Sequence, residues 1–394
     1  MPVHIECGID LFLKQVAQTS PDISYGLVTN RACIDRLGMP VTDALINANI
    51  NIKKIFSPEH GYKATGADGV YQPDTRLNNK EIPIVSLYSN QLKPAVQDFI
   101  GLDAMLIDLP NIGSRYYTYL WTMDLVLEAC NEYKLPVVIL DRPNPLGGRL
   151  DYKEGPVIDP SNYSFIGNWA IPIRFGLTLG ELALLLKQEK KYTRLEVTVI
   201  KAQDWTRNMS ILQYQYPFLP PSPAITEAAT IWTYPALCYL EATNISEGRG
   251  TAIPFQVAIA PWIDADPLIA SLNQLKLNGV LIEPIVLTPS DYKYAGVECT
   301  GVKLLITDPT SYRPVKCGML IMATLKTLFP DHFTWQPYPT LANPDGMNHF
   351  VRLSGDQRLL RWLDRDPLNH IDELDILLDP KDWTMRTSSI LLYE

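Results

Sequence analysis

The first half of the chain alternates short, almost continuous apolar segments with segments whose apolar residues recur at helical spacing. Apolar runs that predict strands lie at 24–28, 52–56, 83–87, 104–109 and 136–140. Helical periodicity appears at 9–16 and at 118–133. Strands that are apolar on both faces and alternate with helices are typical of a parallel sheet covered on both sides. The pattern therefore predicts an α/β fold, with a Rossmann-like catalytic domain over residues 1–216.

A further helix is marked by a capping box, in which two side chains each bind the backbone N–H of the other residue. Thr178 stands at the N-cap position and Glu181 follows three residues later, just before the apolar run 182–186. The proline-rich stretch 217–223 fits neither a helix nor a central strand, so we place a domain boundary there.

Beyond residue 216 the chain predicts a smaller C-terminal α/β or α+β domain, residues 217–394, which contributes to the cleft. Strand-like runs lie at 255–260, 280–287 and 302–307, and helical periodicity at 266–275 and 318–329.

Composition narrows the classes of protein and of partner. Hydrophobic residues make up 46% of the chain, which is enough for a large core, and the formal net charge is -9. Since no run of basic residues could follow a phosphate backbone, nucleic acid is not an expected partner. No apolar stretch approaches the length of about 18 residues that spans a membrane. Residues 1–6 lack the features of a signal peptide, so we expect a cytoplasmic location, or a periplasmic or secreted one if a leader has been removed.

Several familiar chemistries have no motif in this sequence. It contains no nucleophile elbow, no P-loop, no G-x-G-x-x-G after the first predicted strand and no H-E-x-x-H. Six scattered cysteines form no C-x-x-C pair, and we interpret them as reduced, mostly buried thiols. We therefore expect neither a metal nor a cofactor.

Polar residues follow almost every predicted strand, where the carboxyl ends of parallel strands meet at one cleft. Asn30 follows the first strand, Glu59 and His60 the second, Asp108 the fourth and Asn144 the fifth. This set of carboxylates, amides and one imidazole, together with nearby tyrosines and arginines, favours hydrolysis of a polyhydroxylated ligand by carboxylates.

Glu59 is the sharpest candidate for an acid. It lies between Pro58 and Gly61 at a strand terminus, where burial would favour the neutral form of a carboxyl group. The alternative is that Glu59 caps a following helix or pairs with a surface lysine. His60 alone is more often a hydrogen-bonded structural histidine.

Three further segments have both a functional and a structural interpretation. Arg115 opens the helix after the fourth strand and suits an anion there, or it pairs with Asp108 beneath an aromatic patch. The segment 141–145 is either a rigid ligand loop or a proline-braced turn. The segment 247–251 offers a glycine-flanked acidic and basic pair, or an ordinary turn.

Together, five segments resemble the NamZ-like exo-β-N-acetylmuramidases, bacterial glycoside hydrolases long grouped as a family of unknown function. They are 56–61, 113–119, 140–148, 180–183 and 244–251, and the resemblance runs from about Gly8 to the C-terminus. It implies an enzyme that releases terminal β-linked N-acetylmuramic acid from the non-reducing end of peptidoglycan fragments in cell wall recycling. The presumed catalytic glutamate of the family matches Glu59.

The resemblance and the residues together define an expected site. Glu59 is the general acid/base, and His60 and Asp108 are neighbours that tune or orient it. The sugar site is lined by Asn30, Arg115, Tyr117, Arg142, Asn144, Glu247 and Arg249. An arginine of this set would bind the lactyl carboxylate of the sugar.

Two alternatives stay open at this point. The second catalytic group is either a carboxylate, from Asp108 or Glu247, or the substrate's own 2-acetamido group. The segment 108–112 departs from the acidic, glutamine-containing run that the family tends to have. That departure would favour the other function considered, a non-catalytic protein that binds muropeptides or acidic sugars.

Overall fold

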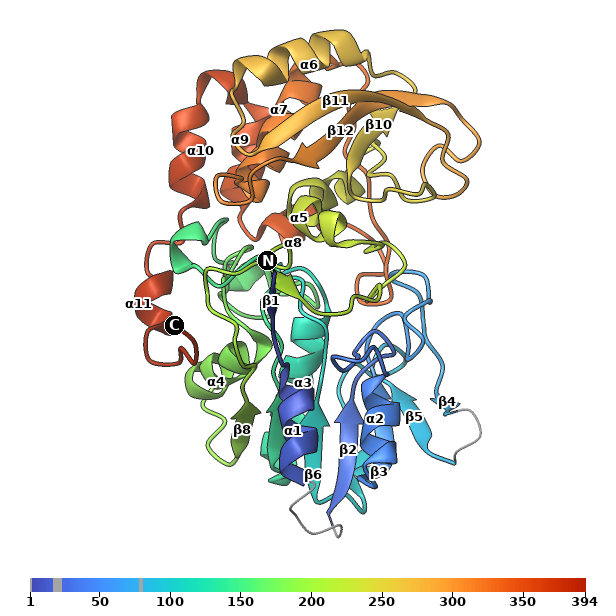
Figure 1. The fold of residues 1–394 in the computed structure, drawn as a ribbon. Coiled ribbons are helices and arrows are strands. Elements are labelled where there is room, and N and C mark those ends of the chain that lie inside the picture. Colours follow the sequence, from blue (N-terminus) through green and yellow to red (C-terminus); the bar gives the residue numbers. More distant parts are fainter. Residues whose placement is uncertain (1, 17–22, 78–80) are drawn as a thin grey trace.

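A seven-stranded sheet forms the centre of the first lobe in this computed structural model, which describes residues 2–16, 23–77 and 81–394 (Figure 1). In spatial order its strands are β4 (Thr75–Arg76), β5 (Pro83–Ser86), β3 (Asn51–Ser57), β2 (Ser24–Val28), β6 (Ala104–Ile107), β7 (Val137–Leu140) and β8 (Val197–Ile200). All neighbouring pairs are parallel except β4 with β5. Leaving the edge strand β4 aside, this is the strand order of a doubly wound Rossmann-like fold.

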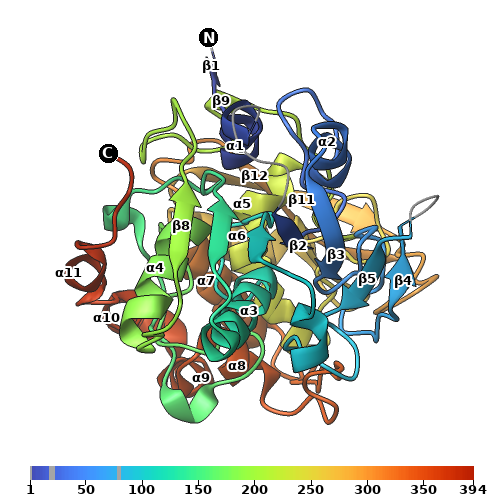
Figure 2. The same cartoon turned by 90° about the horizontal axis from the view of Figure 1, so that it is seen from below.

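Helices cover both faces of this sheet, as Figure 2 shows from below. One face carries α1 (Gly8–Val16) and α2 (Val41–Asn47), and the other carries α3 (Tyr119–Tyr133) and α4 (Leu179–Glu189). Successive strand residues point to opposite faces. Leu27 and Leu106 accordingly lie in one core, while Val28 and Ile107 lie in the other.

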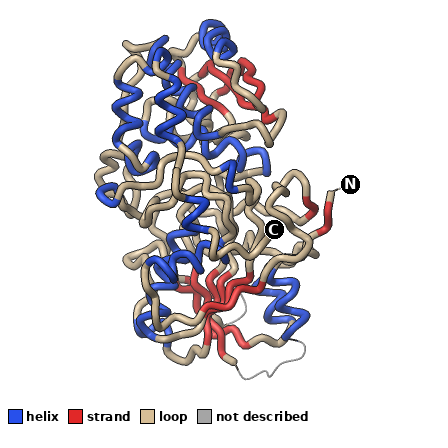
Figure 3. Tube along the Cα trace, turned by 90° about the vertical axis from the view of Figure 1, so that its left-hand side faces the viewer, coloured by secondary structure: helices blue, strands red, loops and turns tan. Residues whose placement is uncertain are grey.

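The second lobe is an antiparallel sheet packed against helices. Its strands, in spatial order, are β10 (Val257–Ala260), β12 (Cys299–Ile306) and β11 (Val280–Leu287). The helices are α5 (Ala228–Leu237), α6 (Ala265–Gln274), α7 (Pro314–Leu328), α8 (His349–Ser354), α9 (Gln357–Asp364) and α10 (Ile371–Leu378). In Figure 3 the two sheets form separate red groups, with helices and loops between them. The predicted α/β fold class, with a smaller second unit, is confirmed.

The last residues of the chain return to the first lobe. Helix α11 (Trp383–Thr387) precedes a tail in which the Tyr393 hydroxyl donates to Asp141 Oδ2 at 2.6 Å. The N–H of Leu392 donates to Glu181 Oε1 at 2.9 Å. A short parallel pair, β1 (Val3–His4) with β9 (Tyr214–Gln215), joins the N-terminal segment to the segment just before the proline-rich stretch. The stretch 217–223 contains neither helix nor strand, and the domain division at residue 217 stays a prediction.

Two expectations about individual residues agree with the structure. All six cysteines are buried and free. Thr178 and Glu181 form the predicted capping box at α4: Thr178 Oγ1 accepts from the Glu181 N–H at 3.2 Å, and Glu181 Oε2 accepts from the Thr178 N–H at 3.0 Å. Across the described ranges, no helix is both long and apolar enough to cross a bilayer.

We expect Thr178→Ala to lower the free energy of unfolding by about 1 kcal/mol, because the Glu181 N–H loses its acceptor at the start of a buried helix. Urea denaturation of the two proteins measures this difference. Thr178→Ser keeps the hydroxyl and should stay close to the original stability, and equal losses in both variants would contradict the capping role.

Candidate functional site

A pocket of about 80 Å³ lies between the two lobes, beyond the carboxyl end of β3. Of the predicted site residues, Glu59, His60, Tyr117 and Arg249 line it. Polar residues that the sequence analysis did not single out line it as well. They are Asp68, Tyr88, Thr118, Ser222, Glu241, Tyr338, Thr340 and His349.

Glu59 is one of two carboxylates, with Asp68, that the first lobe places in this pocket. It is only 6% exposed, and Pro58 sets the direction of the chain as it leaves β3. Its Oε1 accepts a hydrogen bond from the Gly69 N–H at 2.6 Å, and its Oε2 lies 2.7 Å from the Thr118 hydroxyl. Thr118 is the N-cap residue of α3, so the carboxylate lies at the positive end of that helix. Glu59 thus faces a loop amide and a hydroxyl, rather than the helix cap or lysine of the structural alternative.

His60 has a backbone conformation that is uncommon for a residue with a side chain. Its φ of 69° and the φ of 70° at Gly61 turn the chain sharply behind Glu59. Its Nδ1 lies 2.8 Å from the Gly66 carbonyl oxygen, so Nδ1 carries the proton in this contact. Such local strain is concentrated at functional sites.

Asn30 is buried and does not line the pocket. Its amide donates to the Tyr119 hydroxyl at 2.9 Å, and that hydroxyl donates to the Pro221 carbonyl at 2.6 Å. The same hydroxyl lies 3.2 Å from the Glu59 carbonyl oxygen. Asn30 and Tyr119 therefore both hold the Pro221 carbonyl, and the Tyr119 hydroxyl lies beside the backbone of Glu59.

Two of the tyrosines that line the pocket, Tyr88 and Tyr117, have buried hydroxyl groups close to Glu59. The Tyr117 hydroxyl is buried and has no hydrogen-bond partner within the described part of the chain. A buried donor of this kind is available to a ligand hydroxyl. Burial and the negative charge of Glu59 raise the pKa of Tyr88, so its hydroxyl stays protonated beside the carboxylate.

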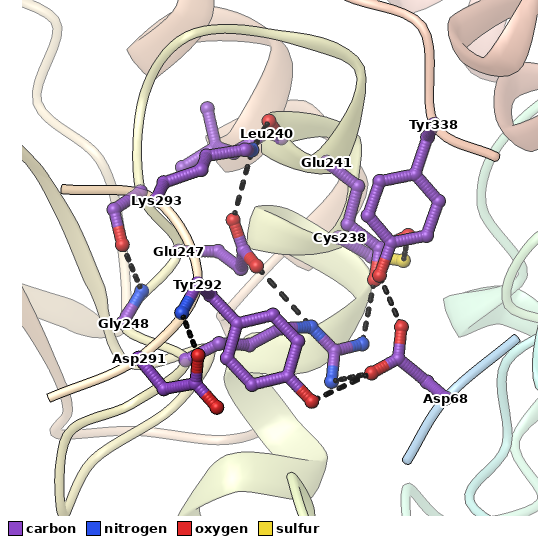
Figure 4. Close-up of polar contacts among 12 residues, drawn as sticks. Asp68, Cys238, Leu240, Glu241, Glu247, Gly248, Asp291, Tyr292, Lys293 and Tyr338 are labelled. Carbon is purple, nitrogen blue, oxygen red and sulfur yellow. Dashed lines mark hydrogen bonds and ion pairs between the residues drawn. The ribbon is translucent and has the colours of Figure 1, made fainter. Parts of the chain in front are cut away.

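Arg249, which also lines the pocket, lies among the carboxylates of Asp68, Glu241 and Glu247, and we call these four residues the Arg249 cluster (Figure 4). Its Nη1 is 2.8 Å from Asp68 Oδ1, its Nη2 is 2.8 Å from Glu241 Oε1, and its Nε is 3.2 Å from Glu247 Oε1. Asp68 comes from the first lobe and the other three residues from the segment 241–249. The cluster therefore joins the lobes at the pocket.

Glu241 is the most strongly stabilised anion of this cluster. It lines the pocket in the 3-10 helix Cys238–Ala242, and its Oε2 lies 3.0 Å from His349 Nε2. Burial alone would raise the pKa of Glu241, but the hydrogen bond from His349 and the charge of Arg249 outweigh burial and lower it to about 2.

The expected anion-binding role of Arg115 does not fit its surroundings. Its guanidinium is fully buried and donates to the carbonyls of Pro156, Ile171 and Leu353 at 2.6 to 2.8 Å. Burial lowers its pKa to about 10. Arg115 therefore holds two loops and the second lobe together, and it does not pair with Asp108 either.

Asp108 and Arg142 form a pair outside the pocket. Arg142 Nη2 is 2.9 Å from Asp108 Oδ2, and Arg142 Nε donates to the other carboxylate oxygen. Asn144 is also structural here, since its amide donates to the Leu177 carbonyl at 2.9 Å. A fully buried carboxylate must be paired, and Arg142 supplies that charge from the next strand end.

Glu247 lies behind Arg249, where its Oε2 is 3.1 Å from Lys293 Nζ. Arg115, Arg142 and Arg249 are thus all bound to acceptors of the protein itself. The buried Nε atoms of Arg115 and Arg249 have no hydrogen-bond partner among the described residues, and of the three arginines only Arg249 lines the pocket. Binding of the lactyl carboxylate by one of them stays a prediction.

Asp68, Glu241 and His349 were missed because no local pattern singles them out. Asp68 lies in a loop without periodicity, and His349 is 108 residues from its partner Glu241. Within the described ranges, no group of three His, Cys, Asp or Glu side chains could hold a metal ion.

Fold and site together define a two-lobed α/β protein whose Rossmann-like half supplies a buried carboxylate to a polar pocket. Residues 25–229 match the N-terminal domain of exo-β-N-acetylmuramidase NamZ, and residues 232–393 match its C-terminal domain. The chain belongs to the NamZ family, and the resemblance noted in the sequence is confirmed.

Known relatives agree with this placement. The peptidoglycan β-N-acetylmuramidase NamZ of Bacillus subtilis (strain 168) is 35% identical over 330 residues, which cover 84% of this chain and 79% of the relative. Two DUF1343 family proteins of Bacteroides fragilis NCTC 9343 have similar crystal structures. One is 28% identical with a TM-score of 0.87 over the whole of both chains, and the other is 26% identical with a TM-score of 0.75 over 99% of both.

The low pKa of Glu241 predicts a specific dependence of stability on pH. A group whose pKa is lower in the folded state contributes stability above its unfolded value of 4.5 and loses it as the pH falls toward 2. We expect this contribution to be on the order of 3 kcal/mol.

Denaturation of the original protein and of Glu241→Gln at several pH values measures it. The difference in unfolding free energy should be largest near neutral pH and should shrink between pH 4.5 and 2. A difference that does not change with pH would contradict the assigned ionisation.

Proposed function

We propose that this protein is an exo-acting glycoside hydrolase that releases terminal β-linked N-acetylmuramic acid from the non-reducing end of peptidoglycan fragments. Glu59 acts as the general acid/base. One observation carries this assignment: Glu59 is buried in the pocket between the lobes, with its two carboxylate oxygens in different surroundings. Membership of the NamZ family supplies the reaction class and the type of substrate.

The two carboxylate oxygens of Glu59 have different hydrogen-bonding roles. Oε1 faces the Gly69 N–H, which only donates, so Oε1 remains an acceptor. Oε2 faces the Thr118 hydroxyl, which can donate to a carboxylate or accept from a carboxylic acid. The proton that Glu59 gives to the leaving glycosidic oxygen is therefore held at Oε2.

We infer that the nucleophile is the 2-acetamido group of the substrate. The other carboxylates of the pocket, Asp68 and Glu241, are each held in an ion pair with Arg249. Asp108 and Glu247, the two expected from the sequence, are paired outside it. This distribution supports a scheme in which one free carboxyl group suffices.

In this scheme the acetamido oxygen attacks C1 while the bond from C1 to the leaving oxygen breaks and Glu59 protonates that oxygen. Water then attacks C1, the bond from C1 to the acetamido oxygen breaks, and a proton of the water returns to Glu59. The Tyr117 hydroxyl, buried beside this point, is available to a hydroxyl group of the sugar.

Turnover of a disaccharide with terminal β-linked N-acetylmuramic acid tests the proposed function. We expect release of the free sugar, detected by chromatography, together with hydrolysis of an aryl β-N-acetylmuramide. Calorimetric heat of binding without release of the sugar would contradict the hydrolase and identify a binding protein instead.

We expect Glu59→Gln to lower turnover of the disaccharide by about 10² to 10⁴, because the amide cannot donate a proton to the leaving oxygen. The defect should be smaller for an aryl substrate, whose leaving group scarcely needs protonation. Turnover numbers on both substrates and the melting temperature measure this. Near-normal turnover of the disaccharide with a clear loss of stability would overturn the catalytic role.

A further inference from the structure

We propose that Asp68 is a positioning residue that couples the contact between the two lobes to the orientation of the Glu59 carboxylate; this inference rests on the proposed function. Asp68 lies in the loop 58–74 of the first lobe, nine residues after Glu59. Its side chain points toward residues of the second lobe (Figure 4).

Three side chains of the second lobe hold the Asp68 carboxylate. Arg249 Nη1 lies 2.8 Å from Oδ1, and the Tyr292 hydroxyl donates to the same oxygen at 3.3 Å. The Tyr338 hydroxyl donates to Oδ2. Both oxygens are therefore bound by donors of the other lobe.

The next residue, Gly69, transmits this contact to Glu59. Its carbonyl accepts from the Leu341 N–H at 2.7 Å, and its own N–H donates to Glu59 Oε1 at 2.6 Å. The φ of Gly69 is 68°, and a Cβ atom there would come within 2.8 Å of the Thr340 side chain. A glycine is therefore needed for the loop to lie this close to the second lobe.

Arg249, which binds Asp68, is itself held by other residues of the second lobe. Arg249 is also bound by Glu241 and Glu247, and its guanidinium lies 4.9 Å from the centre of the Phe255 ring. The side chains of Arg249 and Asp68 are only 9% and 15% exposed, so solvent and salt weaken their attraction little. Because Gly69 follows Asp68 in the chain, a fixed Asp68 also holds the Gly69 N–H at the Glu59 carboxylate.

This arrangement has a consequence for Glu59 that mere support of the loop would not have. A hydrogen bond from an N–H to a carboxylate favours its charged form. If the charge of Asp68 is removed, the Gly69 N–H is held less firmly and the charged form of Glu59 loses part of that support. Loss of the negative charge of Asp68 itself favours the charged form of Glu59, so the pH dependence is tested in a variant that keeps every charge.

Asp68→Asn tests the proposal, because it keeps the size of the side chain and removes its charge. We expect kcat on the disaccharide to fall roughly 10- to 100-fold, as for a misplaced catalytic group, with a smaller change in KM. Tyr338→Phe removes one donor to Asp68 and keeps every charge. It should lower kcat by less than Asp68→Asn and should move the limb of the pH–rate profile that Glu59→Gln abolishes to higher pH.

Asp379→Asn is a matched control. Asp379 pairs with Lys153 at 3.5 Å, in another ion pair that connects the two lobes, but neither residue lines the pocket. The same chemical change there should leave kcat and the pH profile as they are. An equal fall in kcat in both variants, with an unmoved pH profile in Tyr338→Phe, would overturn the proposal.

A measurement without substrate separates this inference from the proposed function. The carbon-13 resonance of the Glu59 carboxyl group, assigned by its loss in Glu59→Gln, reports the pH midpoint of that group. Tyr338→Phe, which leaves every charge in place, should move the midpoint upward, and an unmoved midpoint would overturn the inference even if the enzyme is active. Failure of the original protein to release sugar would overturn the proposed function alone.

Discussion

The pocket depends on the burial of one positive charge, that of Arg249. A guanidinium removed from water must be paired or hydrogen-bonded to acceptors, or the fold loses several kcal/mol. Here the pairing is shared among three carboxylates, and one of them comes from the other lobe. The charge balance of the pocket is therefore complete only when the lobes are in contact. Because Asp68 and Gly69 are neighbours in the chain, the same contact determines what surrounds Glu59.

Sequence pattern predicted the elements whose apolar residues recur regularly. Five strands of the first sheet, β2, β3, β5, β6 and β7, and the capping box at Thr178 follow from local periodicity and local hydrogen bonding, and the structure has them within a few residues. The pattern missed α5, because Pro235 lies inside that helix and argues against one. It also missed β8, an edge strand whose residues are mostly half-buried.

The site residues likewise fall into two groups: those that local sequence predicts and those whose role depends on distant segments. Glu59 and His60 follow a predicted strand, and Tyr117 immediately precedes a predicted helix, so their convergence could be predicted from the order of the elements. The roles of the arginines could not. Whether a guanidinium meets a ligand or a protein acceptor depends on which distant segment lies beside it. Leu353 reaches Arg115 across 238 residues of sequence, and nothing near Arg115 in the chain indicates this.

The return of the C-terminal tail to the first lobe means that the chain crosses between the lobes twice. The first crossing follows the proline-rich stretch 217–223, and the second lies just before α11. The two lobes are therefore joined by two covalent connections. A fragment that ends at residue 216 would lack Tyr393 and Leu392, the partners of Asp141 and Glu181. The first lobe is therefore complete only when the whole chain has been made.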